Sequence, residues 1–389
     1  MSSQNPVFIP GPTNIPDSVR KACDIATLDH RSPAFARIFQ PAVAGVRRIL
    51  KMDAGEVIIL PSTGTGGWEA AITNTLSPGD TVLAARFGMF SHRWIDMCQR
   101  HGLIVEIIET PWGQGAPLAA IKAALLADTG RKIKAVLATH NETATGVKSD
   151  IAGIRAAMDA AQHPALLMVD GVSSIGSMPF EMAVWGVDIA VAGSQKGFML
   201  PAGLAILGIS PNAIAAMATA TLPRAFFDFK DMLRTYATGG YPYTPTVGLI
   251  AGLAHSIQLL EDEGLTAVYA RHHRIAEGVR RAIAAWGMVP CAVSEDLYSD
   301  TVTAVMVPQG CNGTDLVQLA ASKYNVAFGV GLGEVAGKVF RIGHLGMLTD
   351  VMMLSGLACA EMCMADLGWP VTLGSGVAAA QDYYRNSAV

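Results

Sequence analysis

The chain has 389 residues, of which 51% are hydrophobic and only 15% are charged. This length is enough for two domains, and the composition predicts large buried cores or an extensive subunit interface. The net charge of −4 and the absence of a long basic tract argue against a nucleic-acid partner.

The uncharged stretch 197–223 is long enough to span a membrane. Pro201 and Pro211 interrupt it, however, so we expect a buried strand at 202–208, then an alanine-rich helix, and no membrane contact. Residues 1–6 show no basic stretch before an apolar one, which argues against a secretory signal. Six scattered cysteines without a Cys-x-x-Cys pair fit a reducing, cytoplasmic location and predict no metal site.

Three segments are expected along the chain. Residues 1–20 contain Pro10, Pro12 and Pro16 and predict an extended N-terminal arm rather than a helix. Residues 21–262 alternate apolar strand candidates with helical patterns, which is typical of a large α/β domain with a mostly parallel sheet and helices on both faces. Its strands are expected at 57–60, 81–85, 103–108, 135–139, 166–170 and 189–192.

The pattern changes after a helix expected at 247–263. Helices are then expected at 269–286, 314–324 and 350–367, with strands at 301–308 and 339–342. This order of elements predicts a smaller α+β C-terminal domain over residues 263–389.

Two of the expected buried strands lead to chemically useful side chains. One ends in Asp170, and the other is followed by Gly193-Ser194-Gln195-Lys196. Taken singly, such a lysine is usually a solvated loop residue and such an aspartate a cap or turn former. Because chemistry collects at the carboxyl ends of parallel strands, the pair suggests pyridoxal 5'-phosphate (PLP), with Lys196 holding its aldehyde as a Schiff base and Asp170 facing its ring nitrogen.

The segment 62–69 follows the strand at 57–60 and opens a helix. Its Thr63, Gly64 and Thr65 combine close backbone approach, hydroxyl donors and a helix N-terminus, which is the form of a phosphate cradle. The alternative is a glycine-rich turn with a good helix cap. The segment lacks the Gly-Lys-Ser/Thr ending of a nucleotide loop, so a nucleotide-binding protein is a weaker alternative.

Three further residues fit a cofactor site. Phe90 follows a strand and could give an aromatic face to a planar ring, although on this segment alone an ordinary core phenylalanine is the simpler interpretation. Thr143 lies in the polar run 140–147 after another strand, which could also be a capping loop. Arg341 lies inside an apolar strand and requires an anion, either a substrate carboxylate or a structural Asp or Glu.

These motifs together resemble the class V PLP-dependent aminotransferases, and most of all the alanine–, serine– and aspartate–glyoxylate aminotransferases. The resemblance covers nearly the whole chain, and its further markers include Pro10-Gly11-Pro12 and Asp170-Gly171-Val172. It implies the fold of PLP-dependent transferases of fold type I. It also implies a homodimer whose subunits share their active sites.

The resemblance implies a role for each matching residue. Lys196 would bind the cofactor aldehyde and act as the catalytic base, and Asp170 would pair with the ring nitrogen. Val172 would pack beneath the ring, Phe90 would stack above it, and Thr143 would approach the ring oxygen.

The phosphate and the substrate have implied partners too. Thr63, Gly64, Thr65 and Gln195 would hold the phosphate within one subunit, with Tyr241 and Thr244 reaching it from the other subunit. Arg341 would bind the α-carboxylate of the amino acid.

The implied reaction is transfer of an amino group to glyoxylate, which becomes glycine. Aspartate is favoured slightly over serine as the donor, and alanine is the alternative. Aspartate would need a second cationic contact, for which Arg31, Arg37 and Arg274 are candidates, although ordinary pairing is the simpler role of each. Two further alternatives are a cysteine desulfurase using Cys311 and a non-catalytic PLP-binding subunit.

Overall fold

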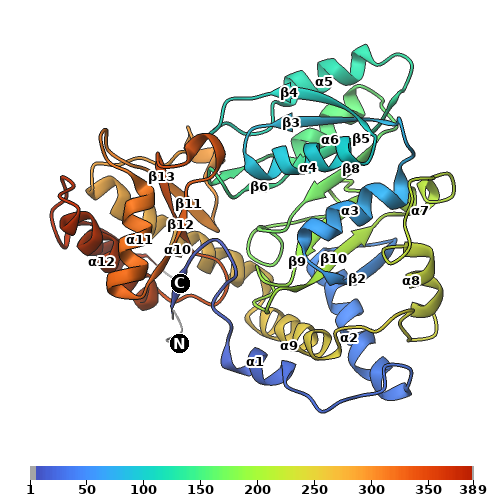
Figure 1. Cartoon of the computed structure of the whole chain (residues 1–389), viewed down its shortest axis with the longest axis horizontal. Helices are drawn as coiled ribbons and strands as arrows, with labels where there is room; N and C mark the ends of the chain where they lie inside the picture. The colour runs from blue at the N-terminus through green and yellow to red at the C-terminus, as the bar shows by residue number, and fades with distance from the viewer. Residues whose placement is uncertain (1–5, 388–389) are drawn as a thin grey trace.

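The computed structural model describes residues 6–387. Residues 1–5 and 388–389 lie outside the described part. The prediction that the chain starts without a secretory signal concerns mainly residues 1–5 and therefore lies outside it as well. Two sheets organise the chain, a large one on the right of Figure 1 and a small one on the left, each with helices packed against it.

The large sheet has seven strands. β10 is antiparallel to both of its neighbours, and the other neighbouring pairs are parallel, so the prediction of a mostly parallel sheet is confirmed. In spatial order the strands are β2 (Glu56–Ser62), β10 (Gly203–Ile209), β9 (Ile189–Gly193), β8 (Leu166–Asp170), β5 (Ile133–Thr139), β3 (Thr81–Arg86) and β4 (Ile104–Glu109).

Helices cover both faces of this sheet. Gly67 of α3 packs on Leu207 of β10, whereas the next residue, Gly208, faces Leu50 and Met52 just after α2. Successive strand residues point to opposite faces, so α3 and the end of α2 lie on opposite faces. The helices of this part are α2 (Pro33–Ile49), α3 (Gly64–Thr75), α4 (Met89–Arg100), α5 (Leu118–Ala127), α6 (Ile151–Ala160), α7 (Pro211–Ala216), α8 (Phe229–Tyr236) and α9 (Val247–Glu263).

The small sheet has the order β1 (Val7–Phe8), β12 (Ala327–Val330), β13 (Val339–Gly343) and β11 (Val302–Met306). β12 was not expected from the sequence, because it is only four residues long. The helices here are α10 (Leu265–Ala285), α11 (Gly313–Tyr324), α12 (Asp350–Asp366) and α13 (Ser375–Asn386). Short elements complete the chain: η1 (Glu295–Leu297), η2 (Gly333–Val335), and the two-stranded β6 (Asn141–Glu142) and β7 (Val147–Lys148).

The prediction that residues 1–20 form only an extended arm is wrong in part. β1 pairs in parallel with β12, so residues 7 and 8 form a strand of the small sheet. Helix α1 (Asp17–Cys23) then begins inside the predicted arm. Between them the chain, dark blue in Figure 1, passes between the small sheet and the rest of the molecule. The sequence did not predict β1 because the segment contains three prolines and the strand's pairing partner lies more than 300 residues away.

The two largest of the four hydrophobic clusters in the described residues belong to different sheets. One draws on residues between Val19 and Val268, and the other on Phe8 and on residues from Ile275 onward. The division into domains near residue 262 stays a prediction, and these separate clusters support it.

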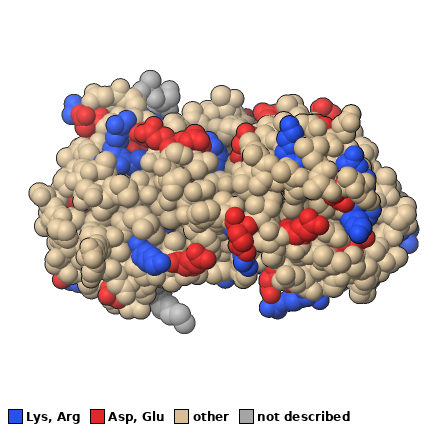
Figure 2. Space-filling model, turned by 90° about the horizontal axis from the view of Figure 1, so that it is seen from above, with Lys and Arg blue, Asp and Glu red and all other residues tan. Residues whose placement is uncertain are grey.

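No helix within residues 6–387 combines the length and apolarity needed to cross a membrane. On the face drawn in Figure 2, basic and acidic side chains are interspersed and separated by large uncharged areas.

Candidate active site

Lys196 and Asp170 meet at one edge of the large sheet. β8 and β9 are parallel neighbours, with Asp170 paired to Val191, so the residues that follow both strands lie at the same edge. Asp170 is the last residue of β8, and Lys196 follows the end of β9 by three residues. The sheet therefore brings together two side chains that are 26 positions apart in sequence.

Asp170 is a buried carboxylate whose ionisation is close to neutral pH. Its Oδ1 accepts a hydrogen bond of 2.9 Å from the backbone N–H of Val172. Burial, with a smaller contribution from the charge of Glu142, raises the pKa of Asp170 to about 7, against the lowering effects of the Val172 N–H, Trp68 and Lys196. A positively charged group near this carboxylate would keep it ionised, as a protonated pyridine nitrogen does.

Lys196 has a depressed pKa and an unusual partner. Burial, together with the charge of Arg341, lowers the pKa of its amine to about 8 against the opposing effect of Asp170. The amine donates a hydrogen bond to the backbone carbonyl of Pro10 in the N-terminal segment. An amine with this pKa is partly neutral at physiological pH, which both a nucleophile and a proton acceptor require.

The predicted phosphate cradle forms the start of α3. Thr63 is the N-cap residue, with an extended backbone and no hydrogen bond from its side chain to the helix. The first N–H groups of α3 and the partial positive charge of its N-terminus are therefore available to an anion. Thr63 and Thr65 are exposed beside Gly64, which is buried.

Val172 links this cradle to the lysine loop. A Cβ at Gly64 would lie 2.4 Å from Cγ2 of Val172, so only glycine allows α3 to begin this close. Nearby, Gln195 Oε1 is buried without a hydrogen-bond partner in the described part of the chain, whereas Trp68 interacts with Asp170 and lowers its pKa. A reactive amine, an adjacent carboxylate and an open helix N-terminus fit the aldehyde, ring nitrogen and phosphate of PLP.

Glu142 was not singled out from the sequence, yet it organises the site. It is fully buried and accepts hydrogen bonds of 3.0 Å from the N–H groups of both Phe90 and Ser91 at the start of α4. Burial raises its pKa against the opposing effect of these donors. Glu142 thereby fixes the backbone of Phe90, the predicted aromatic face. An acidic residue in the polar run 140–147 was the available signal.

Arg341 lies on β13 and approaches the site from the small sheet. Its Nε donates to the Val330 carbonyl at 2.8 Å and its Nη1 to the Thr143 carbonyl at 2.9 Å. No Asp or Glu within residues 6–387 forms an ion pair with Arg341. Burial lowers the pKa of its guanidinium to about 10, and the nearby charge of Glu142 partly opposes this lowering. Arg341 thus forms no direct ion pair in the described chain but is affected by the charge of Glu142, and its role toward a substrate carboxylate stays a prediction. The remaining guanidinium N–H groups can bind a substrate carboxylate.

A second arginine stands beside this site. Arg93 of α4 is exposed, has no carboxylate partner in the described chain, and places its guanidinium carbon 5.4 Å from the centre of the Phe90 ring. Its charge also lowers the pKa of Arg341. Arg274, by contrast, pairs with Asp350 at 2.7 Å and holds the Ser387 carbonyl. Arg274 therefore has the structural role that was its simpler interpretation.

Within the single chain, Tyr241 is engaged elsewhere. Its hydroxyl donates to the Ile59 carbonyl at 2.6 Å, its ring packs against Phe39 and Tyr236, and only 5% of the residue is exposed. Thr244, three residues on, is exposed. Their contact with a phosphate in another subunit stays a prediction, and for Tyr241 it would require a rearrangement of the hydroxyl.

Cys311 does not lie in a reactive setting. Its N–H closes a turn onto the Pro308 carbonyl at 3.0 Å, and its side chain packs against the hydrophobic cluster of the small domain. No group of three or more His, Cys, Asp or Glu side chains within residues 6–387 could hold a metal ion.

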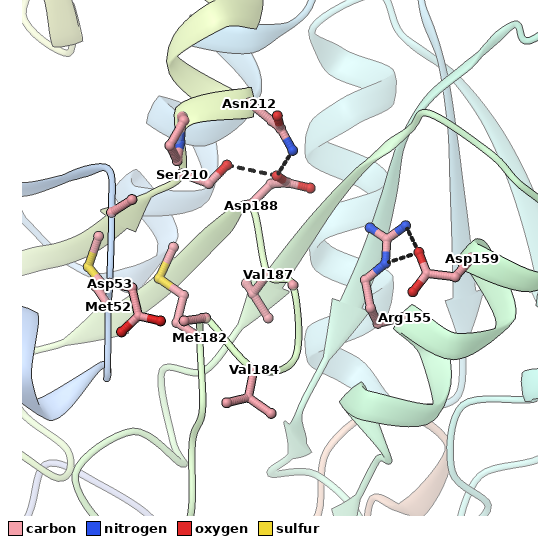
Figure 3. A pocket seen from close by; sticks show the side chains of 14 residues that line it. Met52, Asp53, Arg155, Asp159, Met182, Val184, Val187, Asp188, Ser210 and Asn212 are labelled. Carbon is pink, nitrogen blue, oxygen red and sulfur yellow. Dashed lines mark hydrogen bonds and ion pairs between the residues drawn. The ribbon is translucent and has the colours of Figure 1, made fainter.

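A pocket on the opposite edge of the large sheet can be set aside. Figure 3 shows that Ser210 and Asn212 point at Asp188, which precedes β9. Their hydrogen bonds to its Oδ1 measure 2.7 and 3.2 Å, and Arg155 pairs with Asp159 in the same pocket. Because these groups satisfy one another, the pocket presents no concentration of unpaired chemistry.

Comparison with known proteins identifies the family. Residues 21–373 match the model of the class V aminotransferases. The chain is 66% identical to an L-aspartate–glyoxylate aminotransferase of Paracoccus denitrificans, over all of this chain and 98% of that protein. It is 52% identical to a serine–glyoxylate aminotransferase of Hyphomicrobium methylovorum, over 98% and 95% of the two chains.

A solved structure agrees with these relatives. The fold matches that of a pyridoxamine–pyruvate aminotransferase from Mesorhizobium loti with a TM-score of 0.92 and 29% identity, over 100% of this chain and 98% of that one. The edge that carries Lys196, Asp170 and Arg341 is thus found in a chain that belongs to the class V aminotransferases, enzymes that use PLP to move amino groups between amino acids and 2-oxo acids.

Proposed function

We propose that this protein transfers the amino group of L-aspartate or L-serine to glyoxylate. The products would be glycine and either oxaloacetate or hydroxypyruvate. The observation that carries the proposal is the convergence of Lys196, Asp170 and an Arg341 that forms no ion pair in the described chain, which is 66% identical to an L-aspartate–glyoxylate aminotransferase.

Each residue has a separate task in this proposal. When bound, PLP supplies an aldehyde that takes up the amino group and a ring that accepts electrons from the substrate. Asp170 holds a proton on the ring nitrogen. Lys196, with its pKa near 8, takes the proton from the donor Cα as a neutral amine and later returns it. Arg341 fixes the α-carboxylate so that this Cα–H bond points at Lys196.

The cofactor contacts named from the sequence belong to the same proposal. Val172 and Phe90 enclose the ring from its two sides, and Thr143 approaches its oxygen. Thr63, Gly64, Thr65 and Gln195 hold the phosphate. The open N-terminus of α3 and the contact of Gly64 with Val172 support this arrangement.

Arg93 favours a donor with two carboxylates. The charges of Arg93 and Arg341 repel each other, and a dicarboxylate relieves that repulsion better than a monocarboxylate does. We therefore add Arg93 to Arg31 and Arg37 as a candidate for the second carboxylate of aspartate, whereas Arg274 is paired with Asp350.

Arg93→Gln tests the choice of donor. We expect KM for aspartate to rise about tenfold, the loss of one charge-assisted hydrogen bond, with little change for serine or alanine. Arg100→Gln, on the same helix but paired with Asp96, is the matched control. Equal effects on all three donors would remove Arg93 from this role.

The proposal includes a cytoplasmic homodimer with shared active sites, in which Tyr241 and Thr244 serve the partner. Sedimentation analysis of the PLP-loaded protein measures the dimer. Mixing inactive Lys196→Ala subunits with inactive Tyr241→Phe subunits should restore activity in the mixed dimer if sites are shared.

The central experiment follows each half-reaction separately. PLP-loaded protein is mixed with one amino acid at a time, the visible absorbance of the bound cofactor is followed until it is lost, and glyoxylate is then added. Loss with aspartate or serine and recovery with glyoxylate are expected. Faster loss with alanine would favour an alanine–glyoxylate enzyme, and sulfide release from cysteine a desulfurase. No change with any amino acid would indicate a non-catalytic PLP-binding subunit.

A further inference from the structure

The N-terminal segment 9–13 lies directly on the reactive lysine. The Pro10 carbonyl accepts the hydrogen bond of the Lys196 amine. At Gly11, an added Cβ would lie 2.4, 2.6 and 2.7 Å from Cδ, Nζ and Cε of Lys196. Contacts below 3 Å cannot form without displacement, so a side chain at position 11 would occupy the space of the lysine.

The segment cannot simply move away, because it is held on both sides. The Thr13 N–H donates to the Gln195 carbonyl at 3.2 Å, and the Thr13 hydroxyl approaches the Lys196 carbonyl at 3.4 Å. Toward the small sheet, Gly343 has room for no side chain, since a Cβ there would lie 2.1 Å from the Ile9 carbonyl.

Asn14 closes the segment into a loop. Its amide oxygen accepts from the Val7 N–H at 2.8 Å, and its amide nitrogen donates to the Val7 carbonyl at 2.9 Å. Val7 is itself paired with Ala327 of β12. Asn14 therefore fixes the geometry of the loop without contacting Lys196.

A backbone carbonyl is a suitable partner for a lysine that must work as a base. A neutral amine can donate one N–H to the carbonyl and keep its lone pair for a proton, whereas an ammonium group has only donors. A carboxylate at the same place would favour the charged form instead. The contact with Pro10 orients the amine without adding a negative charge.

We propose that the loop 9–13 is a positioning element for Lys196: the Pro10 carbonyl holds the amine whenever it is not covalently engaged, and position 11 is glycine because the lysine needs that space. Pro10 and Gly11 act through Lys196 and need not touch the substrate. The inference rests on Lys196 being the reactive amine of the proposed enzyme, and it is independent of which amino acid is the donor.

The test compares Gly11→Ala with Gly79→Ala. Both glycines have positive φ angles, +98° and +83°, but a Cβ at Gly79 would meet nothing within 4 Å. Both variants place an alanine at a positive φ angle, and only Gly11→Ala intrudes on Lys196. The main measurement is the rate at which cofactor-free protein takes up PLP, followed by absorbance, which requires no substrate.

We expect Gly11→Ala to take up PLP at least tenfold more slowly and to lose about 100-fold in kcat with a smaller change in KM, the usual result of misplacing a catalytic group by about 1 Å. Gly79→Ala should match the unmodified protein in both. Uptake and kcat in Gly11→Ala equal to those of Gly79→Ala would overturn the proposal.

Asn14→Ala keeps the proposal testable if Gly11→Ala does not fold. This substitution removes both hydrogen bonds to Val7 and should slow PLP uptake and lower kcat less than Gly11→Ala does. Asn14→Asp keeps the acceptor for the Val7 N–H, so its values should lie between those of Asn14→Ala and the unmodified protein. Uptake and kcat unchanged in Asn14→Ala would count against the loop. If the unmodified protein fails to aminate glyoxylate but Gly11→Ala still slows PLP uptake, the proposed function is wrong and the positioning loop stands.

Discussion

The two edges of the large sheet carry aspartates in opposite situations. Asp170, at the carboxyl end of β8, and Asp188, before β9, are each 4% exposed. Asp188 accepts hydrogen bonds from the Leu167 N–H, the Ser210 hydroxyl and the Asn212 amide. Asp170 accepts a hydrogen bond from the Val172 N–H, and burial raises its pKa to about 7. The same residue at the same burial is a structural acceptor at one edge and a poised acid at the other.

This difference shows what separates a site from a pocket. At the edge of Asp188 the protein satisfies its own polar groups, so a concavity there has no chemistry to offer (Figure 3). At the other edge, Asp170, Lys196 and Arg341 have shifted pKa values and can still form hydrogen bonds or ion pairs with a ligand. Such a group of residues is typical of a binding or catalytic site.

The largest expected effect comes from removing the amine at the Asp170 edge. Lys196→Ala should lower the rate of the amino-acid half-reaction by at least about 10⁴-fold, because both the covalent attachment and the base are lost. Stopped-flow absorbance measures this rate. Lys134→Ala, an exposed lysine bonded to the Arg131 carbonyl, should leave it unchanged. Turnover within tenfold of the unmodified rate in Lys196→Ala would remove this lysine from the mechanism.

The two aspartates can be compared directly by the same substitution. Asp170→Ala should lower kcat about 10³-fold, since the ring nitrogen loses its charge partner, with little loss of stability. Asp188→Ala should instead cost about 1–3 kcal/mol in the free energy of unfolding, because buried donors lose their acceptor, and leave kcat nearly unchanged. Chemical denaturation and steady-state kinetics on both variants decide this. If the two variants changed kcat and the free energy of unfolding equally, the two aspartates would not differ in role.

Arg341 is expected to act on substrate binding. Arg341→Gln should raise KM for the amino acid about 100-fold, the value of a lost bidentate carboxylate contact of about 3 kcal/mol. Arg341→Lys keeps the charge but loses the paired N–H geometry and should recover only part of this loss. An unchanged KM in Arg341→Gln, with a fall in thermal stability alone, would show that this arginine serves only the Val330 and Thr143 carbonyls.

The smallest effect is a shift with pH. Only the neutral amine reacts with PLP, so uptake by the cofactor-free protein should have its midpoint near the pKa of Lys196, about 8, and fall tenfold per pH unit below it. Asp170 raises that pKa, so Asp170→Ala should move the midpoint to lower pH. Asp188→Ala should leave it in place. A midpoint near 10.5, the ordinary lysine value, would mean that Lys196 is not buried as described.

The central site was predictable because its geometry follows from local rules. Parallel strands of a buried sheet have recognisable apolar patterns, and their carboxyl ends meet, so Asp170 and Lys196 could be brought together from spacing alone. The helix at 247–263 was predicted with its observed bounds, because its pattern is long and uninterrupted. The reversed direction of β10 gave no local signal, since strand direction depends on the path of the connecting chain.

Contacts between segments that are distant in sequence could not be predicted from local patterns. Glu142 could not be placed under Phe90, nor Arg93 beside Arg341, because each contact depends on how β6, α4 and β13 pack together. The strand β1 was missed for the same reason, since its partner β12 lies at the other end of the chain.

The order of residues by itself determined the chemistry available to this protein: a lysine and an aspartate at neighbouring strand ends, a glycine-rich helix start and an arginine inside an apolar strand. Tertiary structure alone decided which of these groups stay unsatisfied, which carboxylate is poised near neutral pH and which backbone holds the lysine amine. The physical reason is that a pKa, a hydrogen bond or a steric limit at Gly11 depends on atoms brought together from far along the chain.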